Sequence, residues 1–217
     1  MSYIIFIAIL SVGSVLLPLT LAGLQWKKLS GELFALKWLL IASLLSDVLM
    51  FFAGVYFKNS YPVGNVFLIF QFSFFLYIFS LYRKRKDVVL IIWITYLTYY
   101  VLDVIFIENF FRVVPYASAI ASFILILFSF QYLYKLLSEL PTLHIQRLPM
   151  LWVTFSILLY SGGTLFIFLA NNYLLTTHTD WQHGMWVLHN IFNILKNILF
   201  AIALWRNYKM VKSSTLS

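Results

Sequence analysis

Long runs of hydrophobic residues, separated by short polar segments, form the pattern of this chain from end to end. Seven of these runs are long enough to cross a membrane, because about 20 apolar residues in a helix span the roughly 30 Å hydrocarbon layer. We therefore predict an all-α fold, a polytopic bundle of seven transmembrane helices that forms a single domain over residues 1–217. The predicted spans are about 3–24, 35–57, 62–82, 88–108, 115–136, 149–170 and 184–205.

The basic residues predict the orientation of the bundle. Alternate connections and the C-terminal segment hold nearly all of them, and only Lys58 and Arg112 fall in the connections on the other side. Because cytoplasmic loops carry the excess of Lys and Arg, we predict the N-terminus outside and the C-terminus inside. The predicted cytoplasmic residues are Lys27, Lys28, Lys37, Arg83, Lys84, Arg85, Lys86, Lys135, Arg147, Arg206, Lys209 and Lys212.

Composition supports a membrane protein and narrows its chemistry. Hydrophobic residues make up 63% of the chain and charged residues 10%, whereas soluble domains have about a quarter charged residues. The net charge of +8 then reflects topology, and we expect no nucleic-acid partner for "RKRK" at 83–86. The chain has no cysteine, which excludes disulfides, thiolate catalysis and cysteine metal sites. The first apolar run exceeds 20 residues without a basic start, so we expect a transmembrane helix there, not a cleaved signal peptide.

A few polar residues fall inside the predicted spans, and such residues are candidates for function. A rise of 1.5 Å per residue places Asp47 and Gln71 about 17 Å, and Lys196 about 14 Å, from the cytoplasmic ends of their helices. Asp103 and His189 come out higher, at roughly 22–24 Å. We predict a polar core with two layers, formed by the spans 35–57, 62–82, 88–108 and 184–205.

The last span supplies most of this core. His189, Asn193 and Lys196 follow one helical face at i, i+4 and i+7, and Asn190 and Asn197 flank it. Since lipid offers no hydrogen bonds, we expect this face to turn into the bundle. We expect Lys196 to meet Asp47, with Gln71 or Asn193 satisfying the remaining groups. Such a pair is either a tie between helices or part of a hydrated site for binding or transport.

Other motifs indicate no cofactor, metal or catalytic residue. A lysine in the seventh helix is typical of retinal proteins, but Phe192 stands where those proteins carry an aspartate before the lysine. The outer segment "HTDWQH" at 178–183 fits no standard metal-ligand spacing and is expected to be an ordinary polar loop. Ser43 and Asp47 share a face, but serine in membrane helices often bonds its own backbone. "SGG" at 161–163 predicts close helix packing, and Pro18 predicts a kink.

Two stretches resemble a known group of proteins. At "SLLSDVLMFF…GNVFLIFQFSFFLYIFSLYR" and "LLYSGGTLFIFLANN…WVLHNIFNILKNILFAIALW", the chain resembles a family of small, uncharacterised seven-helix inner-membrane proteins of Bacteroidetes-type bacteria. The resemblance implies the fold and the bacterial inner membrane, but no activity. In that family an acidic residue stands where this chain has Gln71. A shorter likeness, limited to "LLIASLLSDVLMFF", is to bacterial lysoplasmalogenases.

Taken together, these observations favour a receptor-like or sensory membrane protein that binds a small or lipidic ligand in its polar core. A separate cytoplasmic signalling protein is then the expected partner, beside the lipid bilayer itself. Two alternatives use the same residues. A small-solute transporter requires a water-accessible path to Lys196 from both faces, and an intramembrane lipid hydrolase requires Asp47 for turnover.

Overall fold

The structure, a computed structural model, describes residues 2–83, 85–139, 144–174 and 179–214, without the side chains of 2, 4, 170–174, 179–183 and 213–214. Within these ranges there is no β-strand. Seven helical stretches are long and apolar enough to cross a membrane, which confirms the predicted class of fold. The elements are α1 (Ser2–Ser14), α2 (Leu16–Leu24), α3 (Gly31–Phe57), α4 (Tyr61–Ser80), α5 (Lys86–Phe106), α6 (Pro115–Glu139), η1 (Ile145–Arg147), α7 (Pro149–Leu174) and α8 (Thr179–Ser214).

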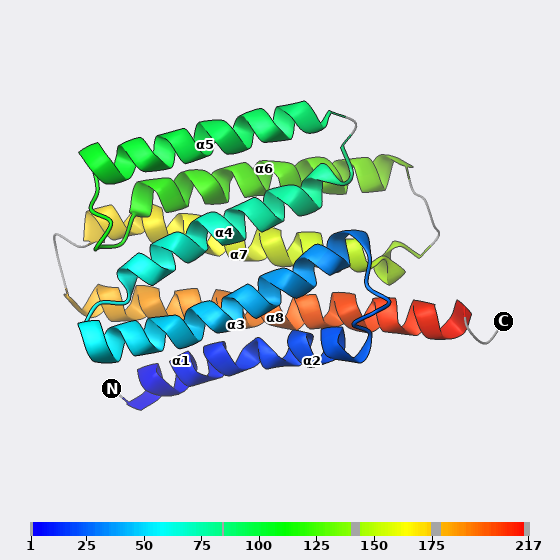
Figure 1. Ribbon diagram of the computed structural model, residues 1–217, viewed down its shortest axis with the longest axis horizontal. Helices are drawn as coiled ribbons and strands as arrows, with labels where there is room; N and C mark the ends of the chain where they lie inside the picture. The colour runs from blue at the N-terminus through cyan, green and yellow to red at the C-terminus, as the bar shows by residue number, and fades with distance from the viewer. Residues whose placement is uncertain (1, 84, 140–143, 175–178, 215–217) are drawn as a thin grey trace.

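The helices run roughly along one common axis, and α8 lies between α7 and the segment formed by α1 and α2 (Figure 1). It packs against α7 and also against α1 and α2, so the beginning and the end of the chain lie side by side. In turn α7 packs against α6, α3 packs against α4, and α5 is an outer helix that contacts α4 and α6. The interior therefore lies between α8, α7, α3 and α4, where buried leucine and phenylalanine side chains form the hydrophobic core.

The two ends of the bundle differ in charge. The segments after α2, α4 and α6 lie at the same end as the C-terminus, opposite the N-terminus (Figure 1). This end, called the basic end below, carries the lysines and arginines of those segments and of the last turns of α8, whereas Lys58 and Arg112 follow α3 and α5 at the opposite end. Lys84 is outside the described residues. The charge separation on which the predicted orientation depends is therefore present in the folded bundle.

Lys37 shows how one of these cations is held near the basic end. Its side chain is buried within α3, and its Nζ lies 4.0 Å from the ring centroid of Trp26 and 4.4 Å from that of Phe34. Aromatic faces attract an ammonium group electrostatically and stabilise it without a carboxylate. Tryptophan is also typical of the interface between membrane and water. The rings of Trp26 and Phe34 therefore stabilise the charge of this buried lysine.

The hydrogen bonds of the first span are interrupted near Pro18. α1 ends at Ser14, about one turn before Pro18, and α2 begins at Leu16. Proline has no N–H, so the carbonyl of Ser14 loses the donor it would have in a regular helix. The Ser14 hydroxyl in turn donates to the carbonyl of Ser11 at 2.6 Å. Val15, between the two helices, keeps a helical backbone, and its carbonyl accepts the N–H of Leu19 at 3.2 Å, so the two helices form one continuous span.

Close contact between α7 and α8 depends on Gly163. A Cβ atom added to this buried glycine would collide with the ring of Phe192 on α8. The neighbouring Gly162 has no atom within 4 Å of the same position. Of the two glycines in the predicted packing motif at 161–163, Gly163 is therefore the one that sets the distance between the helices.

We expect Gly163→Ala to lower the free energy of unfolding by about 1–3 kcal/mol, because the added methyl group overpacks the α7–α8 contact. Gly162→Ala is the matched control, and its stability should be unchanged or slightly raised, since alanine favours a helix. Thermal unfolding of the two purified variants in detergent micelles checks this. Equal stabilities would show that α7 and α8 separate without cost.

Candidate functional site

Lys196 lies in the interior of the bundle, as its place on α8 predicts. It is 4% exposed, and its Nζ lies 4.3 Å from the ring centroid of Tyr160 on α7. Its backbone carbonyl accepts a hydrogen bond from Ser156 Oγ at 2.8 Å, which ties α8 to α7 at this residue. The ammonium group is thus placed against an aromatic face, a contact worth about 0.5–2 kcal/mol.

The ion pair expected between Lys196 and Asp47 does not form. Among the residues that the structure describes, the only side-chain ion pair joins Lys135 and Glu139. Asp47 is half-buried on α3 and interacts with Lys196 only electrostatically, through space. The reason is the packing, because α3 packs mainly on α4 and α2 whereas α8 packs on α7 and on the first span. The prediction of a direct pair is therefore wrong.

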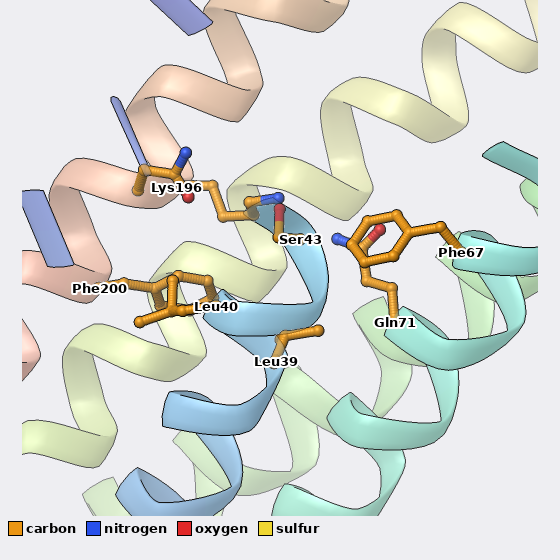
Figure 2. A pocket seen from close by; sticks show the side chains of 8 residues that line it. Leu39, Leu40, Ser43, Phe67, Gln71, Lys196 and Phe200 are labelled. Carbon is orange, nitrogen blue, oxygen red and sulfur yellow. The ribbon is translucent and has the colours of Figure 1, made fainter. Parts of the chain in front are cut away.

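A small cavity lies where α3, α4 and α8 face one another. Figure 2 shows the Lys196 side chain reaching toward Ser43 of α3, and the amide of Gln71 of α4 directed toward the same space. Phe67 and Phe200 close it from two other sides. The cavity volume is about 10 Å³, which is close to the space that a single water molecule requires.

Two nitrogen donors face this cavity, beside the side-chain oxygens of Ser43 and Asn197. Lys196 Nζ can donate three hydrogen bonds, and its described contact is with the face of the Tyr160 ring. The buried Nε2 of Gln71 approaches the Tyr160 hydroxyl but has no well-aligned hydrogen-bond partner. Because an unsatisfied buried donor costs about 1–3 kcal/mol, a hydrogen-bond acceptor in this cavity would be stabilised.

The predicted asparagines of α8 have a different role. Asn193 Nδ2 donates to Ser11 Oγ at 2.9 Å, and Asn197 Nδ2 donates to Ser14 Oγ at 2.8 Å. Asn190 bonds to its own helix, through the carbonyl of Trp186. The asparagines at 193 and 197 therefore fasten α1 to α8, and Asn197 does so while also lining the cavity.

This contact continues toward the basic end. Asn207 Nδ2 donates to Gln25 Oε1 at 2.7 Å, and Gln25 Nε2 donates to the carbonyl of Leu204 at 2.9 Å. Ser11, Ser14 and Gln25 were not among the predicted polar core. The spacing of the serines in the sequence could have predicted this contact, because serines at i and i+3 on one helix can lie opposite asparagines at i and i+4 on another.

Two other residues predicted for the polar core, His189 and Asp103, lie in different parts of the bundle. His189 contacts Tyr160 edge to face, with ring centroids 5.8 Å apart, so it lies near the Lys196 group. Asp103 belongs elsewhere, because α5 packs on α4 and α6 instead of α8. The polar core is thus built from α8, α7, α4, α3 and α1, with Tyr160 and Ser156 as the residues of α7 that sequence reasoning missed.

Asp103 is part of a second polar cluster at the end of the bundle opposite the basic end. It is fully buried, accepts a hydrogen bond from the Tyr99 hydroxyl at 3.3 Å, and lies close enough to the carboxyl group of Glu108 to influence it electrostatically. Glu108 Oε1 accepts the backbone N–H of Tyr116 at 3.1 Å, and Asn65 Nδ2 donates to two carbonyls of the same loop. This cluster therefore fixes the connection between α5 and α6.

No metal site is found in the described residues, where no three His, Cys, Asp or Glu side chains gather. Of the outer segment considered from the sequence, His178 lies outside the described residues, and nothing is described of the side chains of Asp180 and His183. Nor does any described serine hydroxyl hydrogen-bond to a carboxylate or an imidazole, as a hydrolase nucleophile would.

Comparison with known proteins does not place the chain in a family. No protein-family model, no curated protein and no solved structure matches it.

The Glu108 carboxyl group should make stability depend on pH. Burial, and then the neighbouring Asp103 carboxyl group, raise its pKa from 4.5 to about 8, although the N–H of Tyr116 opposes this. The folded protein therefore holds a proton that the unfolded chain releases, so we expect stability to fall as the pH rises from about 4.5 to about 8 and then to level off.

Thermal unfolding of purified protein in detergent micelles across this range of pH measures the effect. Glu108→Gln should flatten the profile, because the amide donates without titrating. Glu139→Gln is the control, since that side chain is 63% exposed and should leave the slope unchanged. Identical slopes for the wild type and Glu108→Gln would contradict a raised pKa of Glu108 in the folded protein.

Proposed function

We propose that this protein is a receptor-like, sensory membrane protein of the bacterial inner membrane, with its basic end in the cytoplasm. The observation that carries the proposal is the pair of nitrogen donors, Lys196 Nζ and Gln71 Nε2, that face one buried cavity. A buried ammonium group without an ion pair is costly in hydrocarbon, and a ligand that brings an acceptor lowers that cost. Seven apolar helices and the charge difference between the two ends support the location.

The donor set defines the class of ligand. Lys196 Nζ and Gln71 Nε2 both present N–H groups to one small space, and a carboxylate accepts hydrogen bonds from both. Phe67 and Phe200 beside it suit an apolar chain behind that carboxylate. The ligand is therefore a small carboxylic acid or a fatty acid. Because the cavity is close to the size of one water molecule, binding must move α3 away from α8.

Helix α8 provides the route for a signal. This helix carries Lys196 at the cavity and continues to Ser214 at the basic end. Along its length it contacts α1, α2 and α7. A ligand that binds one arrangement of α8 better than another shifts the population toward that arrangement. A separate cytoplasmic signalling protein would then read the position of the basic end.

A transporter of small acids is the second candidate, and the missing hydrogen bond at Pro18 in the first span favours it. Transporters build their sites near the middle of the membrane, where helices lose regular hydrogen bonds. The weakened point lies beside the site, because Asn197 both lines the cavity and donates to Ser14 at the end of α1. A movement at this point would open the cavity to the other side.

Ligand binding should be visible as thermal stabilisation of the purified protein in detergent. We expect butyrate or oleate, but not the corresponding alcohols, to raise the unfolding temperature of the wild type. At one hundred times its Kd a ligand adds about 2.7 kcal/mol to the free energy of unfolding. Butyrate alone would indicate a water-soluble acid, and oleate alone would indicate a lipidic one.

Lys196→Met should abolish this stabilisation, because it removes the ammonium group and keeps a side chain of similar length. Lys135→Met is the matched control, since Lys135 is exposed and paired with Glu139. The proposal fails if neither acid stabilises the wild type more than its alcohol, or if Lys196→Met responds as the wild type does.

Uptake separates the receptor from the transporter. In proteoliposomes, a receptor binds labelled butyrate without accumulating it inside, whereas a transporter gives time-dependent uptake. We expect binding without uptake. If uptake occurs and Pro18→Ala reduces it, the weakened point in the first span is part of a transport cycle and the receptor proposal is replaced.

A further inference from the structure

A second, larger recess lies at the basic end, between α6, η1, α7 and α8. Its volume is about 550 Å³, which is within the range of about 300–1,000 Å³ of small-molecule sites. The walls are almost entirely apolar and are formed by the last turns of α6 and the first turns of α7, including Leu133, Leu136, Trp152 and Phe155. α8 contributes Arg206, the only charged side chain in the lining.

Arg206 is held against this apolar recess without an anionic partner. Its Nε is buried and has no hydrogen-bond partner, and its guanidinium carbon lies 5.3 Å from the ring centroid of Trp205 on the same helix. The one ion pair of the described residues, Lys135–Glu139, does not involve it. A guanidinium group is always charged and presents several donors in a plane, so it favours a phosphate or a carboxylate.

The surroundings add to the positive charge. Lys209 Nζ lies 3.8 Å from the Trp205 ring centroid, and Lys135 and Arg147 stand on the neighbouring elements α6 and η1. Glu139, the acidic residue on α6, is already paired with Lys135 at 3.9 Å. An occupant of this recess therefore meets a net positive field, which selects a headgroup with net negative charge.

The depth of the recess matches the boundary between headgroups and acyl chains. It lies at the ends of two membrane-crossing helices, and Trp152 Nε1 donates to the carbonyl of Gln146 at 2.9 Å, with the apolar part of the ring in the wall. Tryptophan is enriched at this level of a membrane. Phe155 and the adjacent Leu137 are exposed on the outer surface of the bundle, so the apolar wall is continuous with the lipid-facing surface.

We propose that this recess binds one anionic phospholipid, with its phosphate on Arg206 and the upper part of an acyl chain against Leu133, Leu136 and Phe155. Charge complementarity argues for the headgroup, and the apolar walls, continuous with the lipid-facing surface, argue for a lipid instead of a free phosphate. The site is separate from the cavity at Lys196, because ten residues of α8 place Arg206 about 15 Å further along that helix. It stands whether or not Lys196 binds a ligand.

Native mass spectrometry of the purified protein, with dioleoyl phosphatidylglycerol or dioleoyl phosphatidylcholine added to the micelles, tests this site. We expect one phosphatidylglycerol molecule to be retained and phosphatidylcholine to be lost. Arg206→Gln should weaken phosphatidylglycerol binding roughly tenfold, as expected for the loss of charge-assisted hydrogen bonds. Arg206→Lys, which keeps the charge but loses the planar donors, should weaken it by a smaller factor.

Arg85→Gln is the matched control, because it removes the same charge from an exposed position at the basic end. It should bind phosphatidylglycerol as the wild type does. The proposal is overturned if Arg206→Gln and Arg85→Gln lose lipid equally, since the attraction is then diffuse, or if both lipids are retained equally. It is also overturned if glycerol phosphate without acyl chains binds as tightly, since the site is then a phosphate site and not a lipid site.

Discussion

Hydrocarbon offers no hydrogen bonds, so each polar side chain inside the spans has to find its partner within the protein. Most of this bundle obeys that constraint in simple ways. Ser118, Ser122 and Ser129 donate to carbonyls of their own helix, and the asparagines of α8 donate to the serines of α1. Because these groups are satisfied, the places where the constraint is only partly met stand out.

Two of those places share a chemistry. At the cavity, Lys196 and the unpartnered Nε2 of Gln71 face one small space, and at the basic end Arg206 presents a guanidinium group without an anion. Both lie on α8, and in both the missing partner is an anionic acceptor that a ligand from outside the chain can supply. The cluster of Asp103 and Glu108 differs, because its buried groups are carboxyl oxygens, and Tyr99 and the N–H of Tyr116 each donate to one of them.

Helix α8 connects these features mechanically. It is fastened to the first span through Asn193, Asn197 and Asn207, and it is held close to α7 where Gly163 faces Phe192. A movement of α8 therefore has to move α1 and α2 with it, or break hydrogen bonds that lipid cannot replace. Because the first and the last span are coupled, a movement of α8 at the proposed Lys196 site would also move α1 and α2.

The sequence by itself determined the class of fold, the approximate limits of the seven spans and the inward face of α8, because each follows from hydrophobic length and helical period alone. It also located the interruption at Pro18 and the small residues beside Phe192, which are local effects. Only the tertiary structure decided which helices are neighbours. Depth along the membrane placed Asp47 level with Lys196 and Asp103 level with His189, but two residues at one depth meet only if their helices pack together. Here α8 packs on α7 and α1, and Lys196 therefore lies against Tyr160 and not in an ion pair with Asp47.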